Sequence, residues 1–151
     1  MKILFVCTGN TCRSVMAEKL LKKMLKENSI NGVEVESAGI ATLPSYRIFG
    51  DLKKVLGEEE LDVNGHTPTQ ITKEMLNNAD LILVMEMSHK QYILNLIPGI
   101  KKKVFLLKEY VIGRKEGVSD PIGMPYDVYK KTMKEIKELI RILITKLKER
   151  K

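Results

Sequence analysis

The chain has 151 residues and a formal net charge of +7, a size that suits one domain spanning residues 1–151. No apolar stretch approaches the roughly 20 residues that a membrane-spanning helix needs, and the start of the chain lacks the layout of a signal peptide. We therefore expect a cytoplasmic protein with no membrane partner. Two cysteines in such a chain argue against a disulfide framework, and with two scattered histidines they do not make a zinc site.

Strands and helices alternate in the first half of the chain. Residues 2–6 are short, apolar and bounded by turn residues, which indicates a buried strand, and residues 33–37 predict a second one. Residues 13–27 place their apolar side chains on one side of a helix. A second helix is predicted over residues 45–57, with Ser45 as its N-cap.

The second half continues this alternation. The expected elements are a short helix at 72–77, a strand at 79–85, a helix at 88–97, a strand at 103–107, a long loop at 113–127 and a C-terminal helix from about residue 126. The strands are continuous apolar runs, which is typical of a parallel sheet covered on both faces. The predicted fold class is α/β, a three-layer sandwich with a four-stranded parallel sheet between helices.

Much of the positive charge lies in the predicted C-terminal helix, whose apolar residues recur at helical spacing with lysines between them. This pattern is typical of a solvated helix face. No platform of aromatic and basic residues accompanies it, so we expect no nucleic-acid partner.

Residues 7–14, C-T-G-N-T-C-R-S, connect the first predicted strand to the first predicted helix. The N–H groups of such a loop can converge on an anion, and the helix N-terminus adds partial positive charge. Gly9 and Asn10 tolerate the positive φ that a tight curl requires, and Arg13 offers a two-pronged donor for phosphate. The same field favours the thiolate of a cysteine at its centre. We therefore interpret Cys7 as a nucleophile in phosphoryl transfer rather than as a buried thiol at a strand end.

Expelling an alkoxide, a phenoxide or a guanidine requires a general acid. Asp120 precedes Pro121 in the long loop, and the proline restricts the backbone before it, which helps to aim the carboxylate. An Asp-Pro pair alone is usually a turn. Because this loop and the first loop both open on the carboxyl edge of the sheet, Asp120 is the candidate acid.

Residues 7–14 together with Asp120 and Pro121 resemble the low-molecular-weight protein tyrosine phosphatase family, and the resemblance covers nearly the whole chain. It implies a flavodoxin-like strand order 2-1-3-4, phosphorylated proteins as substrates, a monomer, and no metal or other cofactor. It also implies that Cys7 forms a phosphocysteine and that Asp120 first protonates the leaving group and then activates water. Arg13 and the loop N–H groups would hold the transferring oxygens. The implied substrate-binding residues are Thr8, Gly9, Asn10, Thr11, Cys12, Ser14, Leu43 and Ile122.

The resemblance further implies a network that supports the loop. Asn10 would take an unusual backbone conformation, with Ser37 and His66 forming hydrogen bonds around it. Ser14 would donate a hydrogen bond to the Cys7 sulfur and ease its departure.

Thr11 sets this sequence apart from the tyrosine-specific pattern. Tyrosine phosphatases of the family usually carry Ile or Leu there, and they often carry aromatic walls near the positions of Leu43 and Ile122. The loop CTGNTCRS resembles the bacterial protein-arginine-phosphatase branch instead. A threonine hydroxyl could contact a polar guanidinium, so Thr11 favours phosphoarginine over phosphotyrosine. The alternative is that Thr11 is only a tolerated variant.

Two other functions stay open on the sequence alone. Arsenate reductases can share this loop, but they need further cysteines to relay a disulfide, and this chain has only Cys7 and Cys12. A non-catalytic phosphoprotein-binding module would have lost the nucleophile or the acid. Cys12 itself carries a redox hypothesis, in which it forms a disulfide with a peroxide-oxidised Cys7. The alternative for Cys12 is a small buried thiol.

Overall fold

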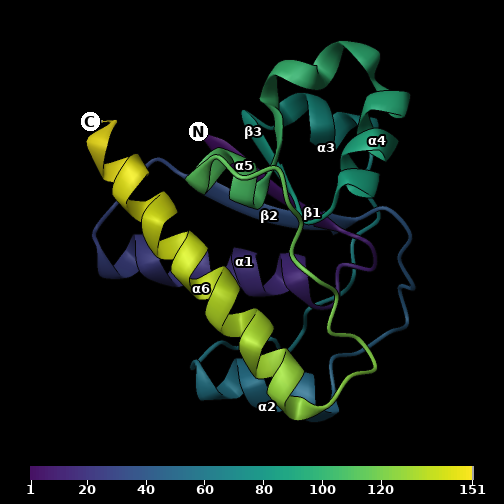
Figure 1. Cartoon of the computed structure of the whole chain (residues 1–151), viewed down its shortest axis with the longest axis vertical. Helices are drawn as coiled ribbons and strands as arrows, with labels where there is room; N and C mark the ends of the chain where they lie inside the picture. Colours follow the sequence, from purple (N-terminus) through teal and green to yellow (C-terminus); the bar gives the residue numbers. More distant parts are fainter. Residues whose placement is uncertain (151) are drawn as a thin grey trace.

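The computed structural model describes residues 1–150 and centres on a parallel sheet (Figure 1). The strands are β1 (Lys2–Cys7), β2 (Glu34–Gly39), β3 (Leu81–Val84) and β4 (Val104–Leu106). They lie in the order β2-β1-β3-β4, and each neighbouring pair is parallel. The predicted α/β class, the four parallel strands and the strand order are therefore confirmed.

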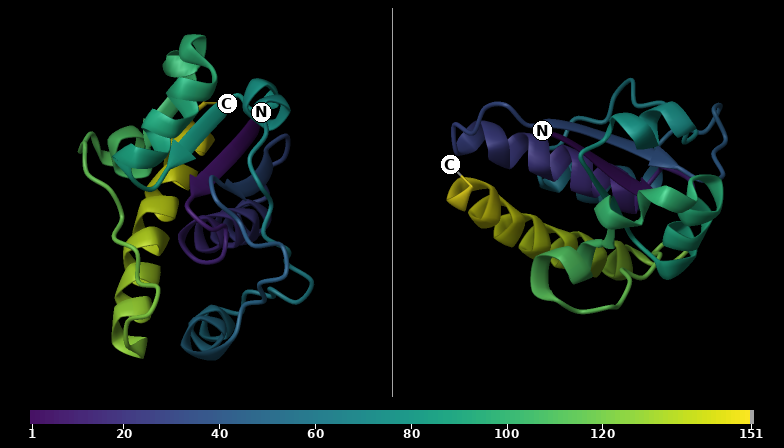
Figure 2. Two further views of the ribbon diagram at one scale, coloured as in Figure 1. Left: turned by 90° about the vertical axis from the view of Figure 1, so that its right-hand side faces the viewer. Right: turned by 90° about the horizontal axis from the view of Figure 1, so that it is seen from above.

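Helices cover both faces of the sheet (Figure 2). They are α1 (Arg13–Glu27), α2 (Gly50–Glu58), α3 (Lys73–Asn78), α4 (Met87–Leu96), the 3₁₀ helix η1 (Pro98–Lys103), α5 (Leu107–Ile112) and α6 (Tyr126–Glu149). Alternate side chains of β1 enter two separate cores. Ile3 and Phe5 pack with residues of α1, α2, α5 and α6, whereas Leu4 and Val6 pack with residues of α3, α4 and η1. Full burial of each such side chain contributes roughly 1.5–3 kcal/mol, which fixes the register of the strand that ends at Cys7.

The helix predicted from Ser45 begins at Gly50 instead, so the proposed N-cap is wrong. The backbone before Gly50 is committed to a turn, in which the Tyr46 N–H donates to the Leu43 carbonyl at 3.0 Å. The guanidinium of Arg47 then donates to the Tyr46 carbonyl at 3.0 Å. These local partners replace the hydrogen bonds of a first helical turn.

Two helical segments beside β4 were not predicted from the sequence. The Lys101–Lys103 run that precedes β4 lies within η1, and β4 is only three residues long, shorter than the predicted strand at 103–107. The chain then enters α5, where the Glu109 carboxylate accepts the Leu106 N–H at 3.1 Å, and Gly113 ends the helix at φ +73°. A short apolar run of this kind has no periodicity that separates helix from strand.

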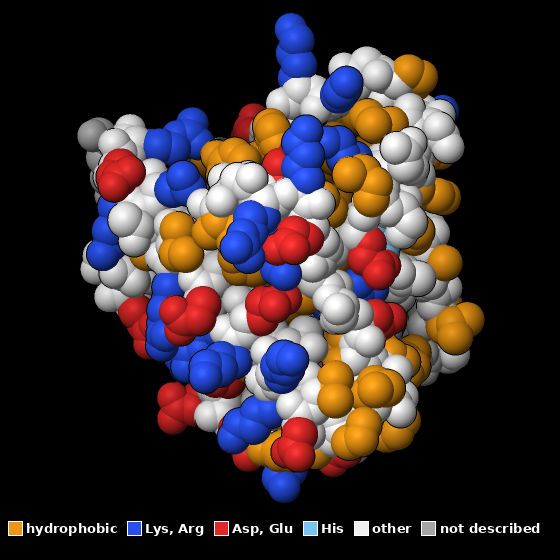
Figure 3. Space-filling view, viewed as in Figure 1, with side chains coloured by type: hydrophobic (Ala, Val, Ile, Leu, Met, Phe, Trp, Pro, Cys, Tyr) orange, Lys and Arg blue, Asp and Glu red, His pale blue; other side chains and the backbone are white. Residues whose placement is uncertain are grey.

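Basic and acidic side chains are interspersed over the face shown in Figure 3. Between α6 and the end of α2, the Nζ atom of Lys137 lies 2.6 Å from an Oε atom of Glu59. Across residues 1–150, no helix combines the length and the apolar character needed to cross a membrane.

Candidate active site

The loop between β1 and α1 curls at the carboxyl edge of the sheet. Cys7 is the last residue of β1, and Arg13 is the first residue of α1. Asn10 between them has φ +54°, the left-handed conformation expected for the curl. Gly39 of β2 lies directly behind the loop, where an added Cβ would meet the Thr8 carbonyl oxygen at 2.6 Å. Glycine at position 39 therefore allows the loop to close against β2.

The Cys7 sulfur lies 2.8 Å from the Ser14 hydroxyl oxygen. The side-chain amide of Asn10 donates one hydrogen to Ser14 Oγ and the other to Ser37 Oγ, each at 2.9 Å. Because Ser14 Oγ accepts from Asn10, its own hydrogen is available for the sulfur. The network therefore directs a hydroxyl donor at Cys7.

Two further polar groups of Asn10, which is fully buried, also have partners. Its backbone carbonyl oxygen lies 2.8 Å from His66 Nε2, and its Oδ1 accepts the Thr69 N–H at 2.9 Å. The structure thus brings together Asn10, Ser37 and His66 as the family resemblance implies.

Glu18 extends this network and was missed by sequence reasoning. Ser37 Oγ donates to Glu18 Oε1 at 2.5 Å, and Lys22 Nζ donates to the other carboxylate oxygen at 2.6 Å. Glu18 is buried although it is acidic, and it lies one helical turn after Ser14 on α1. That spacing, on the helix that follows the loop of residues 7–14, is the signal that could have revealed it.

We predict that Ser37→Ala lowers the free energy of unfolding by about 1–3 kcal/mol, because it leaves an Asn10 amide hydrogen and the Glu18 carboxylate without their partner in a buried site. Urea denaturation measures the change. The matched control is Ser88→Ala, which removes an exposed hydroxyl from the first turn of α4. Equal free energies of unfolding for the two variants would contradict a stabilising role of the Ser37 hydrogen bonds.

Arg13 is 2% exposed and lies between two carboxylates. Its Nη1 atom donates to the Val118 carbonyl oxygen at 2.8 Å and lies 3.4 Å from Glu86 Oε2. Its Nη2 atom lies 3.6 Å from Asp120 Oδ2. A buried guanidinium with both ends held in this way presents a fixed fork to an anion in the loop.

Asp120 reaches this edge on the segment that connects α5 to α6 (Figure 1). Val118 anchors the segment by donating its N–H to the Met85 carbonyl oxygen at 2.8 Å. Asp120 Oδ1 accepts the Ile122 N–H at 3.1 Å, and the carboxylate remains 43% exposed. The candidate acid therefore faces solvent beside the loop, where a leaving group or a water molecule can reach it.

The turn after β3 supplies two further polar residues that the sequence did not single out. His89 is completely buried, and its Nδ1 accepts the Glu86 N–H at 3.1 Å while its Nε2 lies 2.9 Å from Thr8 Oγ1. Burial, helped by the nearby charge of Arg13, lowers the pKa of His89 to about 4. The imidazole is therefore neutral at pH 7. Glu86 and His89 come shortly after a central strand, at the sheet edge where the first loop opens, and this position could have identified them as candidate site residues.

The sequence profile of the low molecular weight phosphotyrosine protein phosphatases matches residues 2–151. The chain belongs to this family.

Several relatives of this low molecular weight phosphatase match it along almost its full length. It is 42% identical to a protein-arginine-phosphatase of Bacillus subtilis, over 99% of this chain and 98% of that relative. It is 34% identical to a low molecular weight protein-tyrosine-phosphatase, PtpB, of Staphylococcus epidermidis, over 93% and 94% of the two chains. The structure of a cysteine-to-serine mutant of YwlE arginine phosphatase, with a phosphorylated active-site serine, aligns at a TM-score of 0.92 and 41% identity, over 98% and 96%. The expected family and the resemblance to its arginine-phosphatase branch are confirmed.

The expected wall residues of the phosphatase are accessible. Leu43 is 69% exposed and Ile122 is 47% exposed, and Ile122 follows Asp120 by two residues. Thr11 is partly buried in the loop, with its Oγ1 3.5 Å from the point where a Cβ on Gly9 would lie. None of these three residues provides an aromatic surface for stacking.

Cys12 is buried at the N-terminus of α1, and both it and Cys7 are free thiols. Burial, with the neighbouring Cys7, raises the pKa of Cys12 far above its ordinary value. Cys12 therefore stays protonated at neutral pH, and its role in resolving an oxidised Cys7 stays a prediction.

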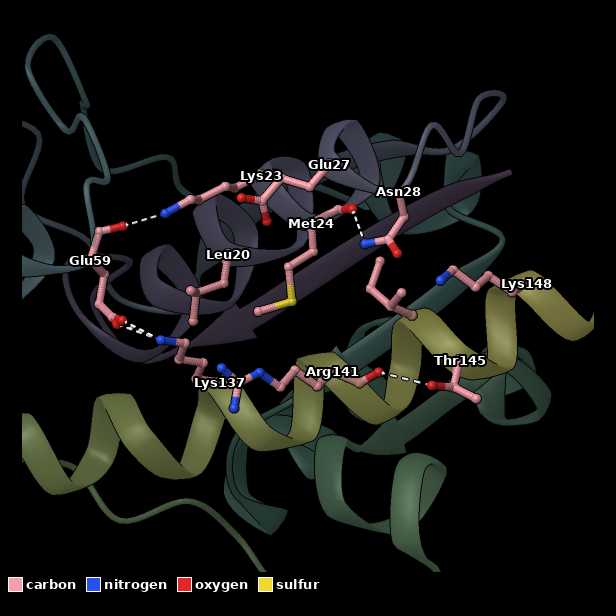
Figure 4. A pocket seen from close by; sticks show the side chains of 11 residues that line it. Leu20, Lys23, Met24, Glu27, Asn28, Glu59, Lys137, Arg141, Thr145 and Lys148 are labelled. Carbon is pink, nitrogen blue, oxygen red and sulfur yellow. Dashed lines mark hydrogen bonds and ion pairs between the residues drawn. The ribbon is translucent and has the colours of Figure 1, made fainter.

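A separate cavity of about 440 Å³ lies between α1 and α6 (Figure 4). Its Lys137 donates to both carboxylate oxygens of Glu59, and Lys23 donates to the Glu59 carbonyl at 2.8 Å. None of the residues that line it belongs to the loop of residues 7–14. The cavity is therefore separate from the candidate active site.

Proposed function

We propose that this chain is a cysteine-dependent protein phosphatase that hydrolyses phosphoarginine, with phosphotyrosine as the alternative substrate. The observation that carries the proposal is the convergence at one sheet edge of the Cys7 sulfur, the buried Arg13 fork and the Asp120 carboxylate. A relative named protein-arginine-phosphatase with 42% identity supports the choice of substrate.

In the first step, the Cys7 thiolate attacks phosphorus while the bond from phosphorus to the guanidine nitrogen breaks. Asp120 gives its proton to that nitrogen, and a phosphocysteine remains. In the second step, Asp120 takes a proton from a water molecule whose oxygen attacks phosphorus. The phosphorus–sulfur bond breaks, its electron pair returns to Cys7, and the Ser14 hydroxyl stabilises the departing sulfur.

The other residues of the loop bind the transferring group in this proposal. Backbone N–H groups of residues 8–13 and the guanidinium of Arg13 surround the phosphoryl oxygens and stabilise their charge in the transition state. Leu43 and Ile122 border the entrance, and Ser37 and His66 hold Asn10 in its curled conformation. The same proposal makes the chain a single-domain monomer that acts on phosphorylated proteins in the cytoplasm, where its two thiols stay reduced.

The proposal is tested by comparing kcat/KM for a phosphoarginine peptide and a phosphotyrosine peptide, in wild type and in Thr11→Ile. We expect wild type to prefer phosphoarginine. Thr11→Ile should shift the ratio toward phosphotyrosine by about tenfold or more, because the substitution removes the hydroxyl that contacts the guanidinium. An unchanged ratio would show that Thr11 does not select the substrate.

The Cys7→Ser variant is the control for the activity itself. It should abolish the hydrolysis of p-nitrophenyl phosphate, because a serine hydroxyl is a far weaker nucleophile than a thiolate at neutral pH. A protein that binds phosphopeptides but releases no phosphate in wild type would be a binding module instead.

A further inference from the structure

The hydrogen bonds of His89 determine which of its ring nitrogens carries the hydrogen. Nδ1 faces the backbone N–H of Glu86 at 3.1 Å and must accept it. A neutral imidazole with an accepting Nδ1 carries its hydrogen on Nε2. Nε2 lies 2.9 Å from Thr8 Oγ1 and 3.4 Å from Glu86 Oε2, so the threonine oxygen is its closer acceptor.

This arrangement leaves the hydroxyl hydrogen of Thr8 unused by His89. Thr8 Oγ1 accepts from the histidine, so the Thr8 hydroxyl must find another acceptor for its own hydrogen. Thr8 follows Cys7 directly, and it is exposed at the mouth of the loop. Its hydroxyl hydrogen is therefore available to a group at the mouth of the loop, while its oxygen is held by a histidine that is itself completely buried.

The proposed chemistry offers one acceptor in particular. In the proposed mechanism the three equatorial oxygens of the transferred phosphoryl group face the loop N–H groups and Arg13. The group in line with the sulfur, which leaves in the first step and attacks in the second, faces Asp120. In the first step that group is a guanidine nitrogen, which uses its lone pair to take the proton from Asp120. In the second step it is a water oxygen with two lone pairs, of which one attacks phosphorus and one is free.

We propose that the Thr8 hydroxyl donates a hydrogen bond to the water that attacks the phosphocysteine, and that His89 is the positioning residue that turns the hydroxyl toward it. The inference rests on the two-step function proposed above. The water gives one hydrogen to Asp120 as its oxygen bonds to phosphorus, and the sulfur leaves with the electron pair of the phosphorus–sulfur bond. Thr8 transfers no proton; it fixes the direction of the attacking lone pair.

The surroundings of His89 keep its ring neutral from pH 5 to 8. Burial and the charge of Arg13 favour the neutral imidazole, against the opposing effects of Glu86 and Asp120. The pKa of His89 near 4 means that its single hydrogen stays on Nε2 at pH 5 to 8. Thr8 consequently faces the same donor throughout this range.

Rapid mixing with p-nitrophenyl phosphate separates the two steps. The initial burst of p-nitrophenol measures formation of the phosphocysteine, and the later linear phase measures its hydrolysis. With this substrate the p-nitrophenolate departs readily without a further donor, so we expect Thr8→Val to keep the burst rate within about threefold. The linear phase should slow by about 10- to 100-fold, the range typical of a lost positioning interaction. Mass spectrometry after acid quenching should then show phosphorylated protein approaching one phosphate per active site.

The variants that test the role of the hydroxyl are conservative. Thr8→Ser should recover most of the linear rate, because it restores the donor. Thr145→Val, on the exposed side of α6, is the matched control and should behave like wild type. His89→Gln should slow the linear phase when Thr8 is present and have no further effect in the Thr8→Val background. If His89 had only a structural role, His89→Gln would slow the linear phase in both backgrounds.

The possible outcomes separate this inference from the function on which it rests. If Thr8→Val slows the burst and the linear phase equally, or slows neither, the inference is overturned while the phosphatase function stands. If wild type itself forms no phosphorylated cysteine with p-nitrophenyl phosphate, the proposed function fails.

Discussion

Arg13→Lys is expected to lower kcat/KM for p-nitrophenyl phosphate by about 1,000-fold. The variant should still fold, with a melting temperature close to that of wild type. The guanidinium is 2% exposed and is held at both ends, by Glu86 and the Val118 carbonyl on one side and by Asp120 on the other. A lysine supplies one point charge on a flexible stem, so it cannot bind two phosphoryl oxygens at once. Loss of a single transition-state donor in a closed site costs about 100- to 1,000-fold.

The size of this effect distinguishes a catalytic arginine from a structural one. Arg141→Lys is the matched control, because Arg141 lies on α6, is 53% exposed and pairs with Glu138. It should leave kcat/KM within about twofold, as expected for a surface ion pair. If Arg13→Lys also retained nearly full kcat/KM, the guanidinium would serve only to hold the loop that carries Asp120.

The parts of the site that could be predicted from sequence are those in which local constraints act together. Cys7 ends a buried apolar strand, Gly9 and Asn10 supply the curl, and Arg13 opens a helix with a clear apolar side. All of these features lie within a few residues of each other. The structure confirms α1 at its predicted limits and the left-handed Asn10 for the same reason.

The residues that were missed depend on contacts between distant parts of the chain. Glu18 becomes significant only because the register of β1 and β2 sets Ser37 opposite Phe5, within reach of α1. His89 lies in an ordinary first helical turn, and its contact with Thr8, 81 residues away in the chain, cannot be read from the local sequence. Before the late start of α2, the chain forms a turn in which the Tyr46 N–H donates to the Leu43 carbonyl, and no hydrophobic pattern encodes this turn.

Asp120→Asn is expected to have the largest effect when the leaving group is poor. Asparagine keeps an oxygen that can accept the Ile122 N–H, so the local backbone should hold its conformation. It cannot give a proton to a departing atom or take one from water. A positioned acid or base contributes about 100- to 10,000-fold, so kcat for phenyl phosphate should fall within that range.

The dependence on the leaving group is the sharper measurement. p-Nitrophenolate departs readily without a proton, so the first step with p-nitrophenyl phosphate should slow by less than about tenfold, whereas the first step with phenyl phosphate should slow fully. A plot of the logarithm of the burst rate against leaving-group basicity should therefore be steep in Asp120→Asn and shallow in wild type. Asp127→Asn, in the first turn of α6, is the matched control and should keep the shallow slope. Equal slopes in wild type and Asp120→Asn would assign the proton to another group, and Glu86, which shares Arg13 with Asp120, would be the first to test.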